Sequence, residues 1–124
     1  MASALDVAKY ILREAGSMTA MKLQKLVYYS QAWSLVWDDA AMFNERIEAW
    51  ANGPVVRKLY NAHRGEFKIS SLGEGRISDL SVDNRETIDA VLEHYGDKSA
   101  QWLSDLTHLE APWLDARDGL SAGA

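Results

Sequence analysis

The sequence contains no cysteine, and this absence removes several kinds of chemistry at once. Disulfide bonds, thiolate nucleophiles, cysteine-ligated zinc and iron–sulfur clusters are all excluded. Histidine is scarce as well. His63, His94 and His108 are widely separated, and no pair has the i, i+4 spacing of metal ligands on a helix. We therefore expect no metal site.

Long apolar runs and targeting signals are also missing. No stretch approaches the roughly 18 consecutive apolar residues that a membrane span requires. The N-terminus lacks the basic region of a secretory signal, and Asp6 interrupts its apolar residues. The sequence predicts a soluble cytoplasmic protein that does not contact a membrane.

The short motifs of common enzymes and nucleotide-binding proteins are absent. The chain has no GxGxxG, GxxxxGK[ST], HExxH or GxSxG pattern. The acidic pair Asp38-Asp39 lies in turn-like sequence, and Asp115 and Asp118 lie near the C-terminus, where solvated carboxylates are more common than catalytic ones. We predict no catalytic residue, no cofactor and no enzyme activity.

Positive charge is in short supply in the second half of the chain. Residues 1–62 hold seven basic and six acidic side chains, whereas residues 63–124 hold six and twelve, and the formal net charge of the whole chain is −5. An acidic surface cannot release phosphate counterions effectively, so this charge disfavours nucleic-acid binding.

Apolar residues at helical spacing are abundant, and they predict the first two helices. One helix begins after Ser3 and ends at Gly16; a second begins after Thr19 and runs to about Trp37. The second helix is apolar on nearly every side, which is typical of a buried helix and unsuited to reading DNA. Its polar residues lie in its first turns, so we expect a wet start and a buried C-terminal half.

The middle of the chain is harder to interpret. Residues 38–53 fit either a short strand around Ile47 or a helical turn. Pro54 favours the first position of a helix that ends at Gly65. Residues 66–82 are rich in glycine and serine, and they fit either a weak hairpin or an irregular segment.

Two further helices are expected in the last third of the chain. Asp83 fits the N-cap of the first, which Gly96 ends. Asp97 fits the N-cap of the second, which ends near Glu110 because Pro112 follows.

Together these patterns predict a mainly α protein. At 124 residues the chain is sized for a single domain. We expect a compact bundle of about five helices around a buried central helix at about 20–37. A short β-hairpin or an irregular segment is expected within residues 40–52 and 66–82.

Three separated motifs resemble one protein family. They are Met21-Lys22-Leu23-Gln24-Lys25-Leu26-Val27-Tyr28-Tyr29-Ser30-Gln31-Ala32-Trp33, Ile47-Glu48-Ala49-Trp50-Ala51-Asn52-Gly53-Pro54-Val55-Val56 with Leu59-Tyr60, and Leu106-Thr107-His108-Leu109-Glu110-Ala111-Pro112-Trp113. In this order they resemble the Panacea domain, the family of SocA-like antitoxins and of phage-associated GepA-like proteins. The resemblance covers about residues 5–117, and we expect one domain over residues 1–117. The small and polar residues at 118–124 predict a short flexible tail.

The resemblance implies an antitoxin of a toxin–antitoxin system that neutralises its cognate toxin by direct protein–protein binding. One branch of the family instead suggests a proteolytic adaptor that delivers the toxin to a AAA+ protease. A DNA-binding regulator of its own operon is the third interpretation, and a homodimer stays open. The acidic second half of the chain would steer it toward a basic toxin.

The candidate partner-binding residues come from these motifs. They are Lys22, Lys25, Tyr29, Trp50, Asn52, Tyr60, His108 and Trp113. Most of these residues also have a structural interpretation. The two lysines suit a solvated helix face, and one of Tyr28 and Tyr29 suits the core while the other is half-exposed. Trp50 suits the cover of a turn, and His108 suits stacking on Trp113.

Overall fold

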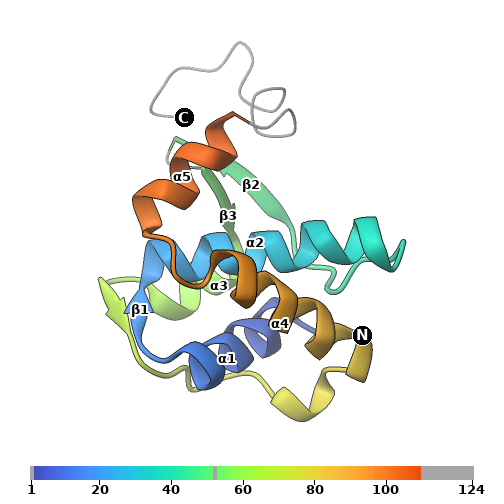
Figure 1. Ribbon diagram of the computed structural model, residues 1–124. Helices are drawn as coiled ribbons and strands as arrows, with labels where there is room; N and C mark the ends of the chain where they lie inside the picture. Colours follow the sequence, from blue (N-terminus) through green and yellow to red (C-terminus); the bar gives the residue numbers. More distant parts are fainter. Residues whose placement is uncertain (1, 52, 110–124) are drawn as a thin grey trace.

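The computed structural model describes residues 2–51 and 53–109, and helices dominate these ranges (Figure 1). The α-helices are α1 (Ala4–Ala15), α2 (Ala20–Trp37), α3 (Arg57–His63), α4 (Val82–Tyr95) and α5 (Ala100–His108). The strands are β1 (Met18–Thr19), β2 (Ile47–Trp50), β3 (Gly53–Val56) and β4 (Lys68–Ile69), and η1 (Ile77–Asp79) is a 3-10 turn. The predicted mainly helical bundle of five helices is confirmed.

The first two helices begin and end where the sequence predicts. The Ser3 hydroxyl accepts a hydrogen bond from the Asp6 amide at 3.2 Å, and the Asp6 carboxylate accepts one from the Ser3 amide at 2.8 Å. This reciprocal pair is a capping box. Gly16 ends α1 at a φ of 83°, and the Thr19 hydroxyl caps α2 by accepting from the Lys22 amide.

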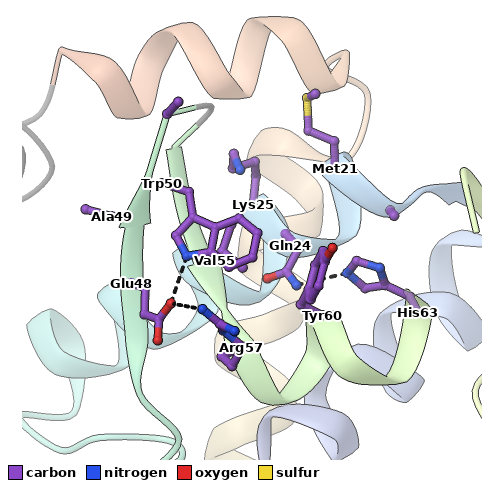
Figure 2. Close-up of a pocket in the computed structure, with 12 residues that line it drawn as sticks. Met21, Gln24, Lys25, Glu48, Ala49, Trp50, Val55, Arg57, Tyr60 and His63 are labelled. Carbon is purple, nitrogen blue, oxygen red and sulfur yellow. Dashed lines mark hydrogen bonds and ion pairs between the residues drawn. The ribbon is translucent and has the colours of Figure 1, made fainter. Parts of the chain in front are cut away.

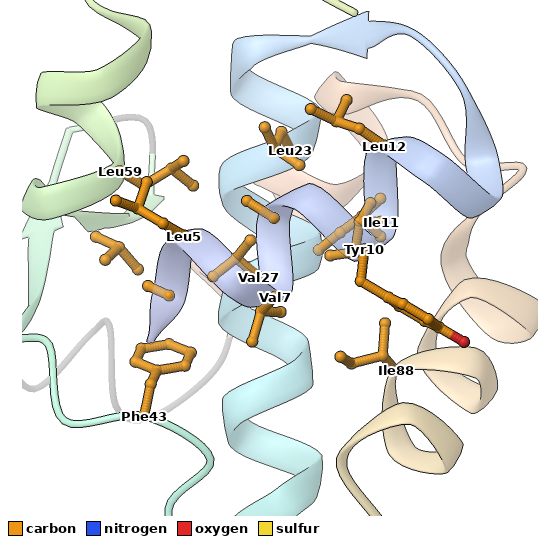
Figure 3. Close-up of a cluster of buried hydrophobic side chains, with 14 of the residues drawn as sticks. Leu5, Val7, Tyr10, Ile11, Leu12, Leu23, Val27, Phe43, Leu59 and Ile88 are labelled. Atoms are coloured by element: carbon orange, nitrogen blue, oxygen red, sulfur yellow. The ribbon is translucent and has the colours of Figure 1, made fainter. Parts of the chain in front are cut away.

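Helix α2 is the central element of the fold. It contacts α1, α3, α4, α5, β1 and β3. Its apolar residues join those of α1 and α4 in one core (Figure 3), and Leu23, Leu26 and Val27 are all 0% exposed. The prediction of a buried central helix is therefore confirmed.

The prediction that the C-terminal half of α2 is buried is wrong for its last turn. The first turn is partly exposed, with Met21 at 37%, and residues 23–27 behind it are all buried, whereas Leu35, Val36 and Trp37 in the last turn are 51%, 77% and 54% exposed. The cause is tertiary: β3 and α5 cross the first half of α2, while its last turn extends past the body of the protein (Figure 1).

The chain from 47 to 56 forms an antiparallel hairpin. Strand β2 pairs with β3 in the register Ile47↔Val56 to Trp50↔Gly53. The prediction that Pro54 opens a helix is therefore wrong, since α3 begins only at Arg57. Pro54 is tolerated in the strand because alternate residues of a strand turn their backbone groups to opposite sides, and this residue turns its carbonyl away from β2.

The remaining differences concern caps and the segment 66–82. Strand β4 pairs with β1, and η1 follows it, so this segment is a minor strand plus irregular chain. Ser81 caps α4 instead of Asp83, and Ser99 caps α5 instead of Asp97. In both cases a serine hydroxyl two residues from the predicted aspartate accepts the helix amide. Helix α5 ends at His108, two residues before the predicted end.

Within residues 2–51 and 53–109, no helix combines the length and the apolar character needed to cross a bilayer.

Candidate binding sites

A cleft of about 670 Å³ opens between the β2–β3 hairpin, the first half of α2 and helix α3 (Figure 2). Helix α2 contributes its floor, the hairpin one wall and α3 the other. The residues that line it are Ala20, Met21, Gln24, Lys25, Glu48, Ala49, Trp50, Ala51, Val55, Arg57, Tyr60 and His63.

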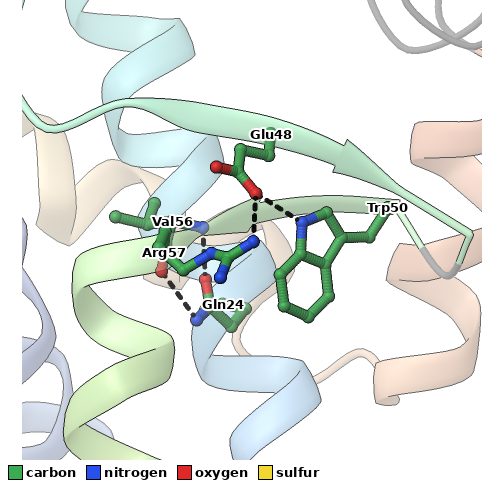
Figure 4. A network of polar contacts seen from close by, with 5 residues as sticks. All are labelled: Gln24, Glu48, Trp50, Val56 and Arg57. Atoms are coloured by element: carbon green, nitrogen blue, oxygen red, sulfur yellow. Dashed lines mark hydrogen bonds and ion pairs between the residues drawn. The ribbon is translucent and has the colours of Figure 1, made fainter. Parts of the chain in front are cut away.

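Gln24 fastens strand β3 to helix α2 (Figure 4). Its side-chain oxygen accepts from the Val56 amide at 2.9 Å, and its side-chain nitrogen donates to the Val56 carbonyl at 3.2 Å. The buried amide of Gln24 thus pairs with the strand as a neighbouring strand would, and it satisfies two backbone groups that face away from β2.

His63 contacts the same amide from α3. Its Nε2 lies 3.0 Å from Nε2 of Gln24, which is a donor. Burial lowers the pKa of His63, and the neutral ring can accept this hydrogen bond. We infer that His63 is neutral in the folded protein at physiological pH.

Lys25 is the buried cation of the cleft. Its side chain is 1% exposed, and its Nζ donates to the Pro54 carbonyl at 3.2 Å. Within the described residues no carboxylate forms an ion pair with it. Burial alone lowers the pKa of Lys25 to about 8.

Gly53 makes room for Lys25 beneath the hairpin. Its φ is +116°, and a Cβ at this position would lie 2.8 Å from both Cε of Lys25 and Oγ1 of Thr107. Only glycine combines this backbone angle with the close approach. The hairpin, α2 and α5 therefore meet around the lysine side chain.

The outer wall of the cleft is a network around Glu48 (Figure 4). One carboxylate oxygen of Glu48 accepts from Nε1 of Trp50 at 2.8 Å and from the Arg57 guanidinium at 3.0 Å. The hydrogen bond from Trp50 has the larger effect on the pKa of Glu48, the hydrogen bond from Arg57 has the next largest, and both lower it. Arg57 also lies over the Trp50 ring at 5.1 Å, and Tyr60 meets that ring edge-on at 4.9 Å.

The structure brings three of the predicted partner-binding residues together at this cleft: Lys25, Trp50 and Tyr60. The interpretation of Lys25 as part of a solvated face is wrong, because strand β3 covers it. Lys22 lies elsewhere, and its Nζ donates to the Gly96 carbonyl at the end of α4 at 2.6 Å. It thereby satisfies a helix C-terminus.

Tyr29 is 2% exposed and stacks on Tyr95 with ring centroids 4.6 Å apart. Tyr28 is half-buried, so the expected division between a core and a partly exposed tyrosine is confirmed. Asn52, Trp113 and the side chain of His108 lie outside the described residues, and so does the expected stacking of the last two.

Sequence reasoning missed most of the polar residues of the cleft. Gln24, Glu48, Arg57 and His63 were not predicted as site residues. A glutamine beside leucines on an apolar helix is a signal of a buried amide that needs partners. The other three side chains are recognisable only once the hairpin brings them to α2.

A second feature lies at the other end of α2. We name the α2-end surface for the exposed Leu35, Val36 and Trp37 together with the carboxylates of Asp38, Asp83 and Glu86. A hollow of about 230 Å³ separates Trp37 from the start of α4 and is lined by all three carboxylates and Thr87. Trp37 is held by edge-on packing against Trp33, with centroids 4.3 Å apart.

Comparison with known proteins gives one family. The family model described as "Antitoxin SocA-like, Panacea domain" matches residues 23–114. This range contains most of the cleft and the whole α2-end surface. Curated proteins and solved structures gave no match.

Proposed function

This chain belongs to the SocA-like Panacea domain family of antitoxins, and we propose that it neutralises a toxin protein by binding it directly and without covalent chemistry. The observation that carries the proposal is the α2-end surface. A helix that is otherwise the centre of the core exposes three consecutive apolar residues there, with Val36 at 77%.

Exposing three neighbouring apolar side chains to water is unfavourable in free energy for a protein that has no partner to cover them. Apolar area removed from water stabilises a complex by about 25 cal/mol per Å², and contiguous apolar patches mark interaction sites. Trp37 is also well suited to bind a partner. Its packing against Trp33 fixes the ring before binding, so little side-chain entropy is lost when a partner covers it.

The charges around the patch indicate the chemistry of the toxin. Asp38, Asp83 and Glu86 border Trp37, and residues 63–124 carry twice as many acidic as basic side chains. A partner that presents arginine or lysine beside an apolar side chain complements this arrangement. Electrostatic attraction between these carboxylates and a basic partner speeds their association, and this attraction weakens as salt is added.

The proposal is tested by substituting one residue of the α2-end surface and one exposed residue beside the opposite end of α2. Val36→Glu places a carboxylate in the apolar contact, and Phe67→Glu is the matched control. Phe67 is 83% exposed, and its carbonyl accepts from the amide of Ala20 at the start of α2. Toxin affinity is measured by biolayer interferometry, and rescue of growth is scored in cells that express the toxin.

We expect Val36→Glu to weaken toxin binding at least about tenfold, equivalent to about 1.4 kcal/mol, and to lose rescue, while Phe67→Glu retains both. Equal binding by the two variants would contradict the assignment of this surface. A pulse-chase of the rescued cells addresses the mechanism. Toxin that persists as a harmless complex agrees with direct inhibition, whereas toxin that disappears would replace it with delivery to a protease.

A further inference from the structure

Within the described residues, the cleft at the start of α2 holds one cation without an ion pair, Lys25, and a second, Arg57, whose guanidinium pairs with Glu48. Among the described residues that line the cleft, Glu48 is the only one with a carboxylate. Its engaged oxygen already accepts from both Trp50 and Arg57, and the hydrogen bonds keep it ionised. The negative charge of Glu48 is therefore already engaged by Trp50 and Arg57 at the outer wall of the cleft.

The two cationic side chains of the cleft have more N–H donors than the protein oxygens that accept hydrogen bonds from them. A lysine ammonium has three N–H groups, and the Pro54 carbonyl accepts one hydrogen bond from Lys25. Arg57 has five N–H groups, and Glu48 accepts one hydrogen bond from its Nη2. Gln24 offers little more, because Val56 and His63 engage its amide. A ligand in the cleft therefore meets positive charge from Lys25 at the floor and Arg57 at the rim.

The rest of the lining is apolar and aromatic. Met21 and Val55 line the cleft, and Trp50 of the hairpin meets Tyr60 of α3 edge-to-face (Figure 2). A volume of about 670 Å³ is in the range that encloses a small organic molecule. The dimensions favour a compact ligand over a folded protein surface.

We propose that this cleft is a binding site for a small carboxylate on an apolar or aromatic stem, with the carboxylate between Arg57 and Lys25 and the stem against Trp50 and Met21. A carboxylate beside Lys25 offsets the cost of holding that ammonium away from water. The site goes beyond toxin neutralisation. The cleft lies about eleven residues along α2 from the α2-end surface. The ligand proposal and the toxin proposal can therefore be refuted independently of each other.

The test uses two probes with the same aromatic stem, 3-phenylpropionate, which carries a negative charge, and 3-phenylpropionamide, in which a neutral amide replaces the carboxylate. Each is titrated into the ¹⁵N-labelled full chain while the Trp50 indole N–H signal is followed by NMR. We expect the carboxylate to shift this signal saturably and the amide to bind at least about tenfold more weakly. Equal binding of acid and amide would refute the charge argument, and so would shifts without saturation.

Variants locate the binding. Lys25→Met and Arg57→Gln should each weaken 3-phenylpropionate binding at least about fivefold, whereas Lys58→Met, at an exposed lysine of α3, should leave it unchanged. Arg57 is exposed, so its variant keeps the test decisive if Lys25→Met fails to fold. Binding that neither substitution weakens would overturn the site. Toxin affinity of the same variants, measured separately, should match that of the unmodified chain.

Discussion

Replacing Lys25 with methionine tests the central electrostatic feature of the fold. Methionine keeps an unbranched side chain of similar length and removes the ammonium. In the folded protein burial lowers the pKa of Lys25 from 10.5 to about 8. The unfolded chain, in which the lysine is solvated, keeps the ordinary value.

The direction of the pH effect follows from proton binding. Between pH 8 and 10.5 the unfolded chain holds a proton on Lys25 that the folded protein has released. Stability rises with pH wherever the unfolded state binds more protons, so the wild-type chain gains stability through this window relative to Lys25→Met. At about 1.4 kcal/mol per pKa unit, the gain between about pH 7 and about pH 9.5 amounts to about 2 kcal/mol.

Tyr10 limits the upper end of the experiment. Burial and its hydrogen bond to Asp89 raise the pKa of Tyr10 to about 12, so above about pH 10 the unfolded chain loses this proton first and stability falls. Staying below that pH separates the two groups, and comparison with the variant cancels the effect of Tyr10.

The measurement is urea unfolding of wild type, Lys25→Met and Lys58→Met, followed by tryptophan fluorescence at four pH values from about 7 to 9.5. The Lys58 variant controls for the loss of an exposed positive charge, and its profile should run parallel to that of wild type. A Lys25→Met profile that also runs parallel to wild type would refute the burial of a charged lysine.

Two further substitutions test how the hairpin is held on α2, each by urea unfolding. Gly53→Ala should destabilise the fold by about 2 to 4 kcal/mol, because it combines a strained positive φ with a methyl group 2.8 Å from two buried atoms; Gly73→Ala, with nothing within 4 Å, should be nearly neutral. Gln24→Leu should cost about 2 to 4 kcal/mol because the amide and carbonyl of Val56 lose their partner. Gln101 is an exposed glutamine whose side-chain amide donates to Asp105, and Gln101→Leu should change stability by less than about 0.5 kcal/mol. Similar losses for both glutamine variants would contradict the anchoring role of Gln24.

Local sequence was sufficient for the helices at the start of the chain. Ser3, Gly16 and Thr19 act within one helical turn of themselves, so their capping roles are readable without any knowledge of the fold. The central position of α2 followed from its apolar circumference. The family resemblance was readable for the same reason, because its motifs are contiguous runs.

The burial of each end of α2 was not readable from its own composition. Lys25 looks like a surface residue among the polar first turns, yet β3 and Gly53 close over it from about thirty residues away. Val36 looks like core, yet nothing in the described chain covers it.

The sequence by itself determined that this chain is a helical bundle around α2, because periodicity and capping are properties of neighbouring residues. Only the tertiary structure decided which turns of α2 are buried, that Pro54 belongs to a strand, and that Lys25, Trp50 and Arg57 share one cleft. These three features depend on contacts between segments that are far apart in the chain. The contacts arise when β2 pairs with β3 and Gln24 binds Val56 through its hydrogen bonds.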